Sequence, residues 1–431
     1  MNYTEAMEKI DSLLVFGSQP GLERISALLE LMGNPQDKVR YVHVAGTNGK
    51  GSVCNMLSGV LVESGLKTGL FTSPHITGFG ERIQINGEMM PESGVIEEVE
   101  RLFPYVVRLR ESGVIITEFE FVTAMAFDWF ARMNCDIVVL ETGMGGRFDA
   151  TNVIKKPLCS IITSISLDHT AVLGDTLGKI AFEKCGIIKP DSRTVFALQQ
   201  SEVNECVIKT AKERNNVLTF APKLTALESS LDGTVVMYEG RRIHLPLLGE
   251  HQLLNLSLVL TALDALWLEG IRIDSEVVSR GIGKVRLPAR FEMLSREPLV
   301  IADGAHNPDG MKALSNAVKK YLADRDLICV IGMLRDKDCS EAVSSLRGLT
   351  KRMITTTIPD NPRRQTAAEL LATVTQQGIA AVSCEDPEKA VKLAFEMAKN
   401  EQDPAIMICG SLYLVSMLRE VAKDTAGGIV K

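Results

Sequence analysis

Several features are scarce in this chain of 431 residues, and each scarcity excludes a class of protein. Positive charge is not in excess, because 47 Lys and Arg stand against 54 Asp and Glu, a formal net charge of −7. We therefore expect no nucleic-acid partner and no binding to an anionic membrane surface. Apolar runs of the ~18 residues that a membrane span requires are also lacking. The most apolar stretch, residues 253–268, contains Asn255 and Asp264 and is better interpreted as a buried helix.

Paired cysteines are lacking as well. The nine cysteines are spread along the chain without any C-x-x-C pair, which argues against a disulfide framework or a structural zinc site. Acidic residues stand near the N-terminus where a secretory signal would carry basic ones, so we expect no export and a reducing cytoplasm. What is present is ordinary for a folded protein: 45% hydrophobic and 23% charged residues exclude disorder as the main state.

The first two-thirds of the chain alternates between short apolar runs and longer helical stretches. Near-continuous apolar runs are typical of strands that are covered on both faces, so we predict a parallel α/β sheet. The predicted strands are residues 41–46, 68–72, 136–141, 159–164 and 194–198. Residues 217–247 are instead rich in β-branched residues and turn signals, which predicts a small antiparallel element on the main sheet.

A second alternation begins near Leu299. Predicted strands at residues 299–302, 327–332, 353–358, 380–383 and 405–409 are separated by helical runs of about a dozen residues. This pattern predicts a smaller, doubly wound Rossmann-like domain. We thus expect an N-terminal domain with a parallel α/β sheet at 1–295, a linker at 296–298 and a C-terminal domain at 299–431, with ligands bound in a cleft.

The strongest chemical signal is the loop of residues 46–52, GTNGKGS, which follows one predicted strand and opens a predicted helix. Backbone N–H groups and a helix N-terminus present positive potential to phosphates, and Lys50 would reach the β- and γ-phosphates. The match to the general P-loop is incomplete, since Val44 stands where the first glycine belongs and Gly51 separates Lys50 from Ser52. The alternative is a tight strand-to-helix turn with one solvated lysine.

A second glycine-rich turn, residues 141–149, follows the strand at 136–140. Phe148 occupies the place of the last glycine of a dinucleotide fingerprint, which disfavours a nicotinamide cofactor. Glu141, at the carboxyl end of a buried strand, is well placed to hold Mg²⁺ near phosphates. The alternative is a structural turn with Glu141 at its edge.

Other polar residues also follow predicted strands. Ser73 and His75 come after one, Asp168 and His169 after another, and residues 303–308, DGAHNP, after the first strand of the second domain. A lone histidine is more often structural than a metal ligand, because Mg²⁺ prefers oxygen. Lys184 stands beside Glu183 in a helical run. The simplest interpretation of this pair is a solvated, salt-bridging face of the helix.

Taken together, these motifs resemble those of the folylpolyglutamate synthase and dihydrofolate synthase family, within the Mur-type ATP-dependent ligases. The resemblance extends through nearly the whole chain, and it is the number and order of the motifs that make it specific. The motifs are GTNGKGS at 46–52, TSPH at 72–75, ERIQING at 81–87, ETGMGGRFDATN at 141–152, SLDHT at 166–170, EKCGIIKP at 183–190, GEHQLLN at 249–255, DGAHNP at 303–308 and GSLYLV at 410–415.

The resemblance implies a role for individual residues. It implies a P-loop-type ATPase domain at 1–295 and a glutamate-ligase domain at 299–431. It also implies nucleotide binding by the loop, magnesium ligands at Ser73, Glu141 and His169, and a carbamate on Lys184, formed when CO₂ turns the ammonium into an extra carboxylate. His306 would help to handle the incoming amino acid. Ala289 stands where the family tends to have glycine. The expected nucleotide contacts are Thr47, Asn48, Gly49, Lys50, Gly51, Ser52, Asn255, Arg290 and Asp303, and the expected catalytic residues are Lys50, Lys184, Asp303 and His306.

The implied reaction is ATP-dependent addition of L-glutamate to a reduced folate or to dihydropteroate. A free carboxylate is a poor acylating agent, and phosphoryl transfer from ATP would convert it into an acyl phosphate that an amine can attack. Such transfer rests on positioning and electrostatics, so no Ser-His-Asp signature is expected. The expected partners are small molecules alone, and family members are commonly monomers.

Three alternatives stay open. A Mur-type amino-acid ligase acting on another carboxylate would share the loop, although the 45 residues before Gly46 leave no room for the extra domain such enzymes usually carry there. A regulatory P-loop NTPase would hydrolyse nucleotide without folate or glutamate. A non-catalytic binding module is disfavoured because Lys50, Glu141 and His169 are all present.

Overall fold

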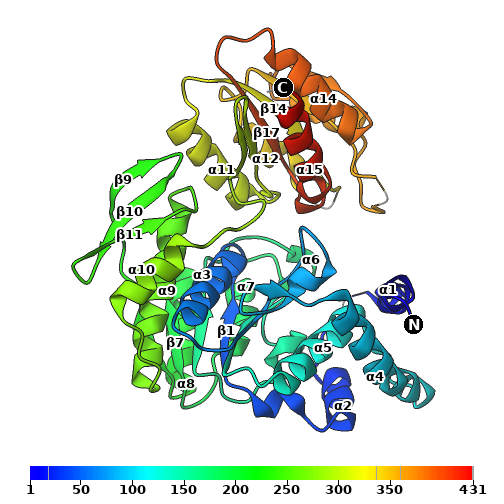
Figure 1. Cartoon of the computed structure of the whole chain (residues 1–431), viewed down its shortest axis with the longest axis vertical. Helices are drawn as coiled ribbons and strands as arrows, with labels where there is room; N and C mark the ends of the chain where they lie inside the picture. The colour runs from blue at the N-terminus through cyan, green and yellow to red at the C-terminus, as the bar shows by residue number, and fades with distance from the viewer. Residues whose placement is uncertain (18, 336, 360, 430–431) are drawn as a thin grey trace. The chain divides into compact units, whose positions relative to one another are not determined.

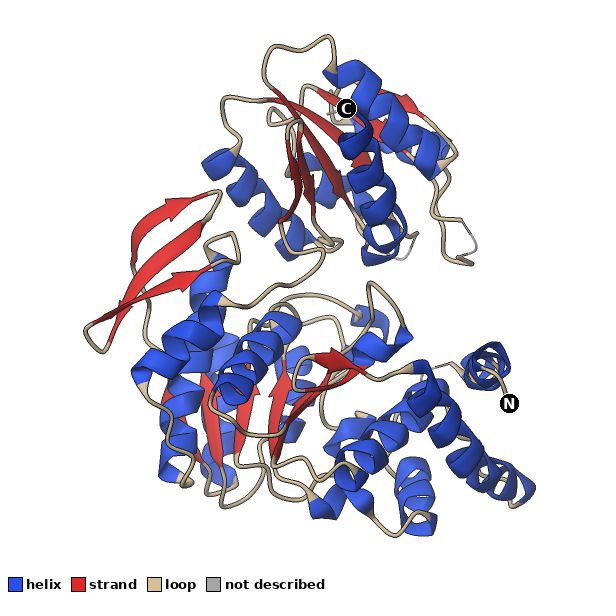
Figure 2. Cartoon of the chain, in the orientation of Figure 1, coloured by secondary structure: helices blue, strands red, loops and turns tan. Residues whose placement is uncertain are grey.

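The computed structural model describes residues 1–17, 19–335, 337–359 and 361–429 (Figure 1, Figure 2). The chain divides into two compact units. The first comprises Met1–Thr225, Val236–His244 and Leu253–Val285, and the second comprises Ala226–Val235, Leu245–Gln252 and the chain from Arg286 onward.

The first unit is built on an eight-stranded sheet of order β4-β3-β2-β5-β1-β6-β7-β8. Its strands are β1 (Tyr41–Ala45), β2 (Thr68–Phe71), β3 (Ile83–Ile85), β4 (Glu88–Met89), β5 (Ile137–Glu141), β6 (Cys159–Ile162), β7 (Arg193–Phe196) and β8 (Val217–Phe220). The six neighbouring strands β2, β5, β1, β6, β7 and β8 pair in parallel, and β3 and β4 add an antiparallel edge. Every residue of β1 and β5 is buried, as expected for strands covered on both faces. The predicted parallel sheet is confirmed.

Helices cover both faces of this sheet. On one face, α3 (Lys50–Glu63) packs against α10 (Ser275–Gly283). On the other face, α7 (Leu177–Lys184) packs against α8 (Ser201–Glu213). The connection from β1 to β2 runs toward one edge of the sheet and those from β6 to β8 run toward the other, so right-handed crossovers put their helices on opposite faces. A large apolar core joins the sheet to four more helices: α1 (Tyr3–Asp11), α2 (Glu23–Leu31), α4 (Glu92–Glu111) and α5 (Glu118–Arg132). The short helix α6 (Thr170–Leu173) and the 3₁₀ turns η1 (Leu14–Phe16), η2 (Pro35–Lys38), η3 (Phe79–Arg82), η4 (Ala150–Val153) and η5 (Cys185–Ile187) complete this unit.

The region 217–247 differs from the prediction in part. Residues 217–220 are not in the small element but form β8, a parallel edge strand of the main sheet. The small sheet itself is present, with order β11-β10-β9: β9 (Ala226–Ser230), β10 (Gly233–Tyr238) and β11 (Arg241–Leu245). Two-residue connections join these strands, and so short a loop makes neighbouring strands antiparallel.

One helix, α9 (His251–Leu268), is long and apolar enough by length and composition to cross a membrane. In this structure 67% of the residues in that stretch are buried inside the protein. The burial favours the predicted core helix.

The second unit contains a six-stranded mixed sheet of order β12-β13-β17-β14-β15-β16. Its strands are β12 (Glu292–Arg296), β13 (Leu299–Ala302), β14 (Asp326–Ile331), β15 (Arg352–Thr355), β16 (Ala381–Ser383) and β17 (Pro404–Cys409). The five strands β13, β17, β14, β15 and β16 pair in parallel, and their ends lie within three residues of the predicted ones. Five helices cover the two faces: α11 (Pro308–Tyr321), α12 (Cys339–Ser344) and α13 (Ala367–Gln376) on one, and α14 (Pro387–Ala398) and α15 (Leu412–Ile429) on the other (Figure 1). The α/β class predicted for this part is confirmed.

The predicted linker at 296–298 needs correction. β12 pairs antiparallel with β13, and Arg296 pairs with Leu299. Residues 297–298 are therefore the turn of a hairpin within the second sheet, and the unit boundary falls earlier, between Val285 and Arg286. The stretch is rich in charge because it belongs to an edge strand, whose residues are half-buried at most.

Candidate active site

The loop of residues 46–52 connects β1 to the first turn of α3, as the sequence predicts. Gly49 caps the helix with φ +87°, a left-handed conformation that side chains rarely adopt. A Cβ there would also lie 2.4 Å from Oδ1 of Asn255, so this amide side chain sits directly against the loop backbone. The structure thus brings Asn255, from α9, to the predicted nucleotide loop.

The loop backbone is fixed by the segment that follows β6. The Thr47 N–H donates to the carbonyl of Ser164 over 2.7 Å, and the Thr163 hydroxyl donates to the carbonyl of Asn48 over 2.8 Å. A Cβ on Gly46 would lie 1.7 Å from Oγ1 of Thr163, so only glycine fits. These contacts order the turn that leads into α3, and the first N–H groups of a helix are suited to binding an anion.

Two lysine ammonium groups converge on one carbonyl in this loop. Nζ of Lys50 donates to the Gly46 carbonyl over 3.2 Å, and Nζ of Lys184 donates to the same oxygen over 2.7 Å. Lys50 also lies 4.0 Å from Oε1 of Glu141. Lys50 and Lys184 thus bring two amino groups to the head of α3, where a polyphosphate would find positive charge.

Glu141 and Ser73 come together at the carboxyl ends of neighbouring strands β5 and β2. The Ser73 N–H donates to Oε2 of Glu141 over 3.3 Å. The Glu141 carboxylate is buried, and its Oε2 lies 3.7 Å from where a Cβ on Gly51 would stand, next to the first turn of α3. The pair offers a carboxylate and a hydroxyl, which are hard oxygen donors that fit Mg²⁺.

His169, the third predicted metal ligand, follows β6 at the same edge of the sheet. It is exposed, caps the short helix α6 and has φ +50°. Within the described ranges, no three His, Cys, Asp or Glu side chains are grouped so as to hold a metal ion on their own. A magnesium site here would therefore depend on the Ser73 hydroxyl and on phosphate oxygens as well.

Lys184 is held in place by the glycine-rich turn after β5. A Cβ on Gly146 would lie 2.8 Å from the carbonyl oxygen of Lys184, and one on Gly186 would lie 2.1 Å from Cα of Arg147. The Arg147 N–H donates to the Glu183 carbonyl over 2.7 Å, and its side chain pairs with the Glu183 carboxylate over 2.7 Å. The turn thus packs backbone to backbone against the end of α7, which positions Lys184.

The Lys184 side chain is 4% exposed, so it does not belong to the solvated face that was one alternative. Burial, and then the charge of Lys50, lower the pKa of Lys184 to about 7 from the ordinary lysine value of 10.5, while Asp168 and Asp149 raise it. About half of such a lysine is therefore the neutral, nucleophilic amine at pH 7, and the other half is the ammonium.

The residues of the second unit that were predicted from the sequence form a group of their own. Oδ2 of Asp303 accepts from the Phe291 N–H over 2.7 Å, and Oδ1 accepts from the Ala305 N–H over 2.8 Å. Burial raises the pKa of Asp303, and the nearby Arg290 guanidinium lowers it. Asp303 therefore fixes the backbone on either side of it and lies close to Arg290.

His306 is part of the same turn, and its Nδ1–H donates to the Gly304 carbonyl over 2.8 Å. Ala289 adopts φ +58°, the left-handed conformation that explains why glycine is usual there. Its carbonyl accepts from the Gly304 N–H over 2.8 Å, and its N–H donates to Oε2 of Glu292 over 3.0 Å. The strained backbone before Arg290 is thus held at both ends.

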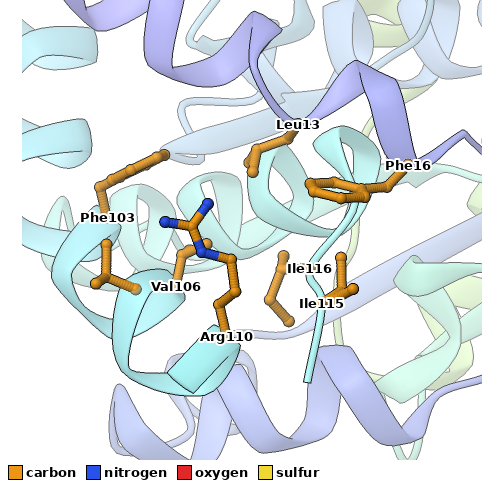
Figure 3. A pocket seen from close by; sticks show the side chains of 8 residues that line it. Leu13, Phe16, Phe103, Val106, Arg110, Ile115 and Ile116 are labelled. Atoms are coloured by element: carbon orange, nitrogen blue, oxygen red, sulfur yellow. The ribbon is translucent and has the colours of Figure 1, made fainter. Parts of the chain in front are cut away.

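An apolar hollow in the first unit lies between η1 and α4 (Figure 3). Arg110 from α4 extends along it, and Leu13 and Phe16 cover it (Figure 3). It contains none of the predicted site residues. Its lining consists of Leu13, Phe16, Phe103, Val106, Val107, Arg110, Ile115 and Ile116.

Sequence reasoning missed the residues that support the site. Thr163 and Ser166 hold the loop, the latter by accepting from Asn48 and donating to Thr47. Asp149 accepts from the Met144 N–H over 2.9 Å and from Thr151, which fixes the glycine-rich turn. Their positions just after strand ends were a usable signal, but hydroxyl residues there carry no distinctive spacing.

Comparison with known proteins agrees with this arrangement. The family model described as the Mur ligase middle domain matches residues 109–263, and that of the Mur ligase glutamate ligase domain matches residues 289–412. Fold and site thus define an ATP-dependent ligase of the Mur class. The chain is 35% identical to a dihydrofolate synthase/folylpolyglutamate synthase of Bacillus subtilis, over 98% of this chain and 99% of that protein. It belongs to the folylpolyglutamate synthase and dihydrofolate synthase family.

Two further likenesses extend the comparison. A probable bifunctional folylpolyglutamate synthase/dihydropteroate synthase of Haloferax volcanii is 34% identical over 97% of this chain, which spans 50% of that protein's length. A crystal structure of Mycobacterium tuberculosis folylpolyglutamate synthase, complexed with ADP and AMPPCP, has a TM-score of 0.88 at 30% identity and covers 99% of both chains. The likeness thus extends through both units.

Proposed function

We propose that this chain uses ATP to join L-glutamate to reduced folates, and that it also accepts dihydropteroate. The observation that carries the proposal is the convergence of Lys50 and Lys184 on the Gly46 carbonyl, at the head of α3 and beside Glu141. This is a place for a polyphosphate and its metal ion. The proposed folate and glutamate substrates rest on the names of the relatives. The proposed nucleotide, ATP, rests on the nucleotides bound in the related crystal structure.

The substrate carboxylate does not react with an amine at neutral pH, because its oxygen is a very poor leaving group. Transfer of the γ-phosphoryl group of ATP to one carboxylate oxygen breaks the bond between the β–γ bridging oxygen and the γ-phosphorus, and forms an acyl phosphate. The glutamate amine then attacks the acyl carbon, phosphate leaves, and an amide remains. Lys50 would offset charge on the transferring group, and the loop N–H groups would hold the adjacent phosphates.

Ser73, Glu141 and His169 would hold Mg²⁺, which would supply charge neutralisation on the phosphates. Lys184 would support that site as a carbamate. CO₂ reacts with a neutral amine, and the lowered pKa of Lys184 makes the neutral form available near pH 7. A carbamate on Lys184 would also turn one of the two facing positive charges into a negative one.

In the second unit, Arg290 and Asp303 would contact the nucleotide, and His306 would act on the incoming glutamate. Asp303 already fixes the Phe291 and Ala305 backbone, so it would orient Arg290. The turn of His306 also places Asn307 as the cap of α11, whose Oδ1 accepts from the Gly310 N–H over 2.8 Å. We propose that the enzyme is cytoplasmic, since free cysteines are typical of a reducing compartment, and that it is a monomer, as the family resemblance implies.

The test is a paired assay with ATP, glutamate and either dihydropteroate or tetrahydrofolate. Lys50→Ala should lower product formation by at least about a hundredfold with either acceptor, the order seen when one preorganised charge or donor is removed. Lys155→Ala, at an exposed ion pair with Asp37, is the matched control and should leave the rate unchanged. Near-normal turnover of Lys50→Ala would refute the role of the loop.

The same assay separates the alternatives. Phosphate release that requires both glutamate and a folate indicates the proposed ligase. Release that requires another acid and amine indicates a different Mur-type ligase, and release without any acceptor indicates a regulatory NTPase.

A further inference from the structure

A buried histidine that the proposed reaction does not use lies in the middle of the main sheet. His43 stands on β1, between β5 and β6, and its side chain is completely buried. Its Nε2 lies 2.8 Å from the hydroxyl oxygen of Thr151, in η4. Within the part of the chain that the structure describes, no group is hydrogen-bonded to the other ring nitrogen, Nδ1. A buried ring with one unpartnered nitrogen is less favourable here than an apolar side chain, so its single bond to Thr151 is what distinguishes it.

The neighbouring groups fix the direction of this hydrogen bond. The Thr151 hydroxyl donates its only hydrogen to Oδ1 of Asp149 over 2.5 Å, so toward His43 it can only accept. Burial, and then the positive charge of Lys189, lower the pKa of His43 to about 3, so the ring is neutral near pH 7 and carries one N–H. That hydrogen is therefore on Nε2. A chain of two hydrogen bonds thus runs from His43 through Thr151 to Asp149.

Asp149 transmits this support to the glycine-rich turn. Its Oδ1 also accepts from the Thr151 N–H over 3.0 Å, and its Oδ2 accepts from the Met144 N–H over 2.9 Å. Met144 is two residues before Gly146, whose backbone packs against the carbonyl of Lys184. The chain of bonds that begins on β1 therefore ends at the turn that positions Lys184.

A second route leads from η4 to the same lysine. Asn152, the next residue of η4, donates from Nδ2 to the Arg147 carbonyl over 3.0 Å and to the Gly186 carbonyl over 3.3 Å. Gly186 is two residues after Lys184, in η5. Because η4 is bonded both to the glycine-rich turn and to the segment after α7, a displacement of η4 would move Lys184. His43 is the residue of β1 that holds η4 in place.

We propose that His43 is a positioning residue: through Thr151 and Asp149 it holds the glycine-rich turn, and with it the end of α7, beside the phosphate loop. The inference rests on the proposed function, because its effect is on the rate of that reaction. β1 continues directly into the loop, whose Gly46 carbonyl accepts from Nζ of Lys184 over 2.7 Å. The bonds made by His43 thus tie Lys184 to the strand that carries its own acceptor.

The experiment compares single variants of the full-length chain in the ligase assay. His43→Leu removes the N–H and should lower kcat by about tenfold or more, since misplacement by about 1 Å can reduce a rate a hundredfold. His43→Gln places an amide N–H near the position of Nε2 and should recover most of the loss. Thr151→Val should lose at least as much as His43→Leu, whereas Thr151→Ser keeps the hydroxyl and should stay near the unmodified rate.

A double variant tests whether His43 and Thr151 act through one bond. If they do, the variant with both His43→Leu and Thr151→Val should lose no more than Thr151→Val alone, because the second change removes no further interaction. Thr194→Val is the matched control. Thr194 is completely buried on β7 of the same sheet, and its hydroxyl bonds to no other described residue, so this variant should keep the unmodified kcat.

¹⁵N NMR of the chain labelled at histidine gives a readout that does not depend on activity. The signal of His43 is assigned by its absence from His43→Gln. We expect a neutral ring with its hydrogen on Nε2, which persists down to about pH 5, where ordinary histidines are protonated.

A hydrogen on Nδ1, or an unmodified kcat in His43→Leu, would overturn the proposal. So would equal losses in His43→Leu and His43→Gln, or additive losses in the double variant, because these would indicate that only the volume of the ring matters. If His43→Leu does not fold, Thr151→Val and Thr151→Ser make the same comparison, and equal rates in these two would overturn the proposal. A failure of the proposed function would show differently, as an unmodified chain without ligase activity in which His43 still has the expected tautomer.

Discussion

Lys184 lies where a lysine ammonium group is energetically unfavourable. Its side chain is buried, its Nζ donates to the Gly46 carbonyl, and Lys50 donates to the same oxygen. Because burial and a second positive charge both disfavour the ammonium, the protein maintains a lysine with a pKa of about 7. The residue type and its spacing in the sequence do not reveal this, since the contact joins positions 138 apart in the chain.

The lowered pKa gives a testable pH dependence. Lys184 binds fewer protons in the folded than in the unfolded state between about pH 7 and pH 10.5, so its contribution to stability increases as the pH rises through that window. Below pH 7 the amine is protonated and cannot react with CO₂. We expect the activity that depends on added bicarbonate to fall as the pH decreases through 7, and a ¹³C NMR carbamate signal from labelled bicarbonate to fall with it.

Two variants serve as controls. Lys184→Ala should lose activity by at least about a hundredfold and should recover part of it with added short carboxylates that substitute for the carbamate. Lys184→Arg keeps the charge but cannot form the carbamate, so it should lose activity without such rescue. The unmodified chain could instead show equal activity in CO₂-free and bicarbonate buffers and no carbamate signal. That result would contradict the carbamate and indicate a purely structural role for Lys184.

At the scale of elements, two backbones that pack without side chains between them determine the position of Lys184. Gly146 allows the turn after β5 to lie against the end of α7, because its missing Cβ would be 2.8 Å from the Lys184 carbonyl oxygen and 2.9 Å from that of Glu183. Both obstacles are backbone atoms, so neither can rotate away. The glycines of this turn, which do not complete a dinucleotide fingerprint, thus have a packing function.

Gly146→Ala should therefore shift α7 and reduce kcat by about tenfold or more without touching a substrate. We also expect a loss of stability of about 1–3 kcal/mol from overpacking. Gly283→Ala is the matched control, since a Cβ there would meet only the His244 carbonyl at 3.9 Å, an ordinary contact. Steady-state kinetics and chemical denaturation of both variants would test these two effects. A wild-type kcat in Gly146→Ala would contradict the role of Gly146 in positioning Lys184.

Elements differ in how far the sequence predicts them, and burial explains the difference. Strands such as β1 and β5 are buried throughout, so their apolar runs are easily recognised. β12 is an edge strand whose residues are half-buried or exposed, and its polar, charged sequence resembles that of a linker. The prediction groups β8 with the small antiparallel element for the same reason, since three of its four residues are exposed.

The candidate site was predictable where backbone conformation restricts residue choice. The glycine-rich residues 46–52 between a predicted strand and a predicted helix indicate a tight strand-to-helix turn, and the structure has this turn, with Gly49 in a left-handed conformation. The support by Thr163 and the contact of Asn255 with Gly49 were not predictable from the residues alone, because they depend on which strands become neighbours. Only the family resemblance indicates Asn255.

At the scale of the whole molecule, the division into two units has a spectroscopic consequence. The chain has two tryptophans, Trp129 and Trp267, and both belong to the first unit. Tryptophan emission during heating therefore follows the unit that carries the phosphate loop, whereas far-ultraviolet circular dichroism follows both. The two signals need not coincide, since a chain of this size can unfold in more than one step.

MgADP should raise the midpoint of the tryptophan-detected transition, because a ligand that binds only the folded state stabilises it. At about one hundred times its Kd the gain is about 2.7 kcal/mol, and a unit of this size gains about 2–4 °C per kcal/mol. Lys50→Ala should lose most of this shift, and Lys155→Ala should keep it. If the shift persisted in Lys50→Ala, or occurred only in the dichroism signal and not in the emission, the nucleotide would bind away from the first unit's loop, and the argument from the two converging lysines would fail.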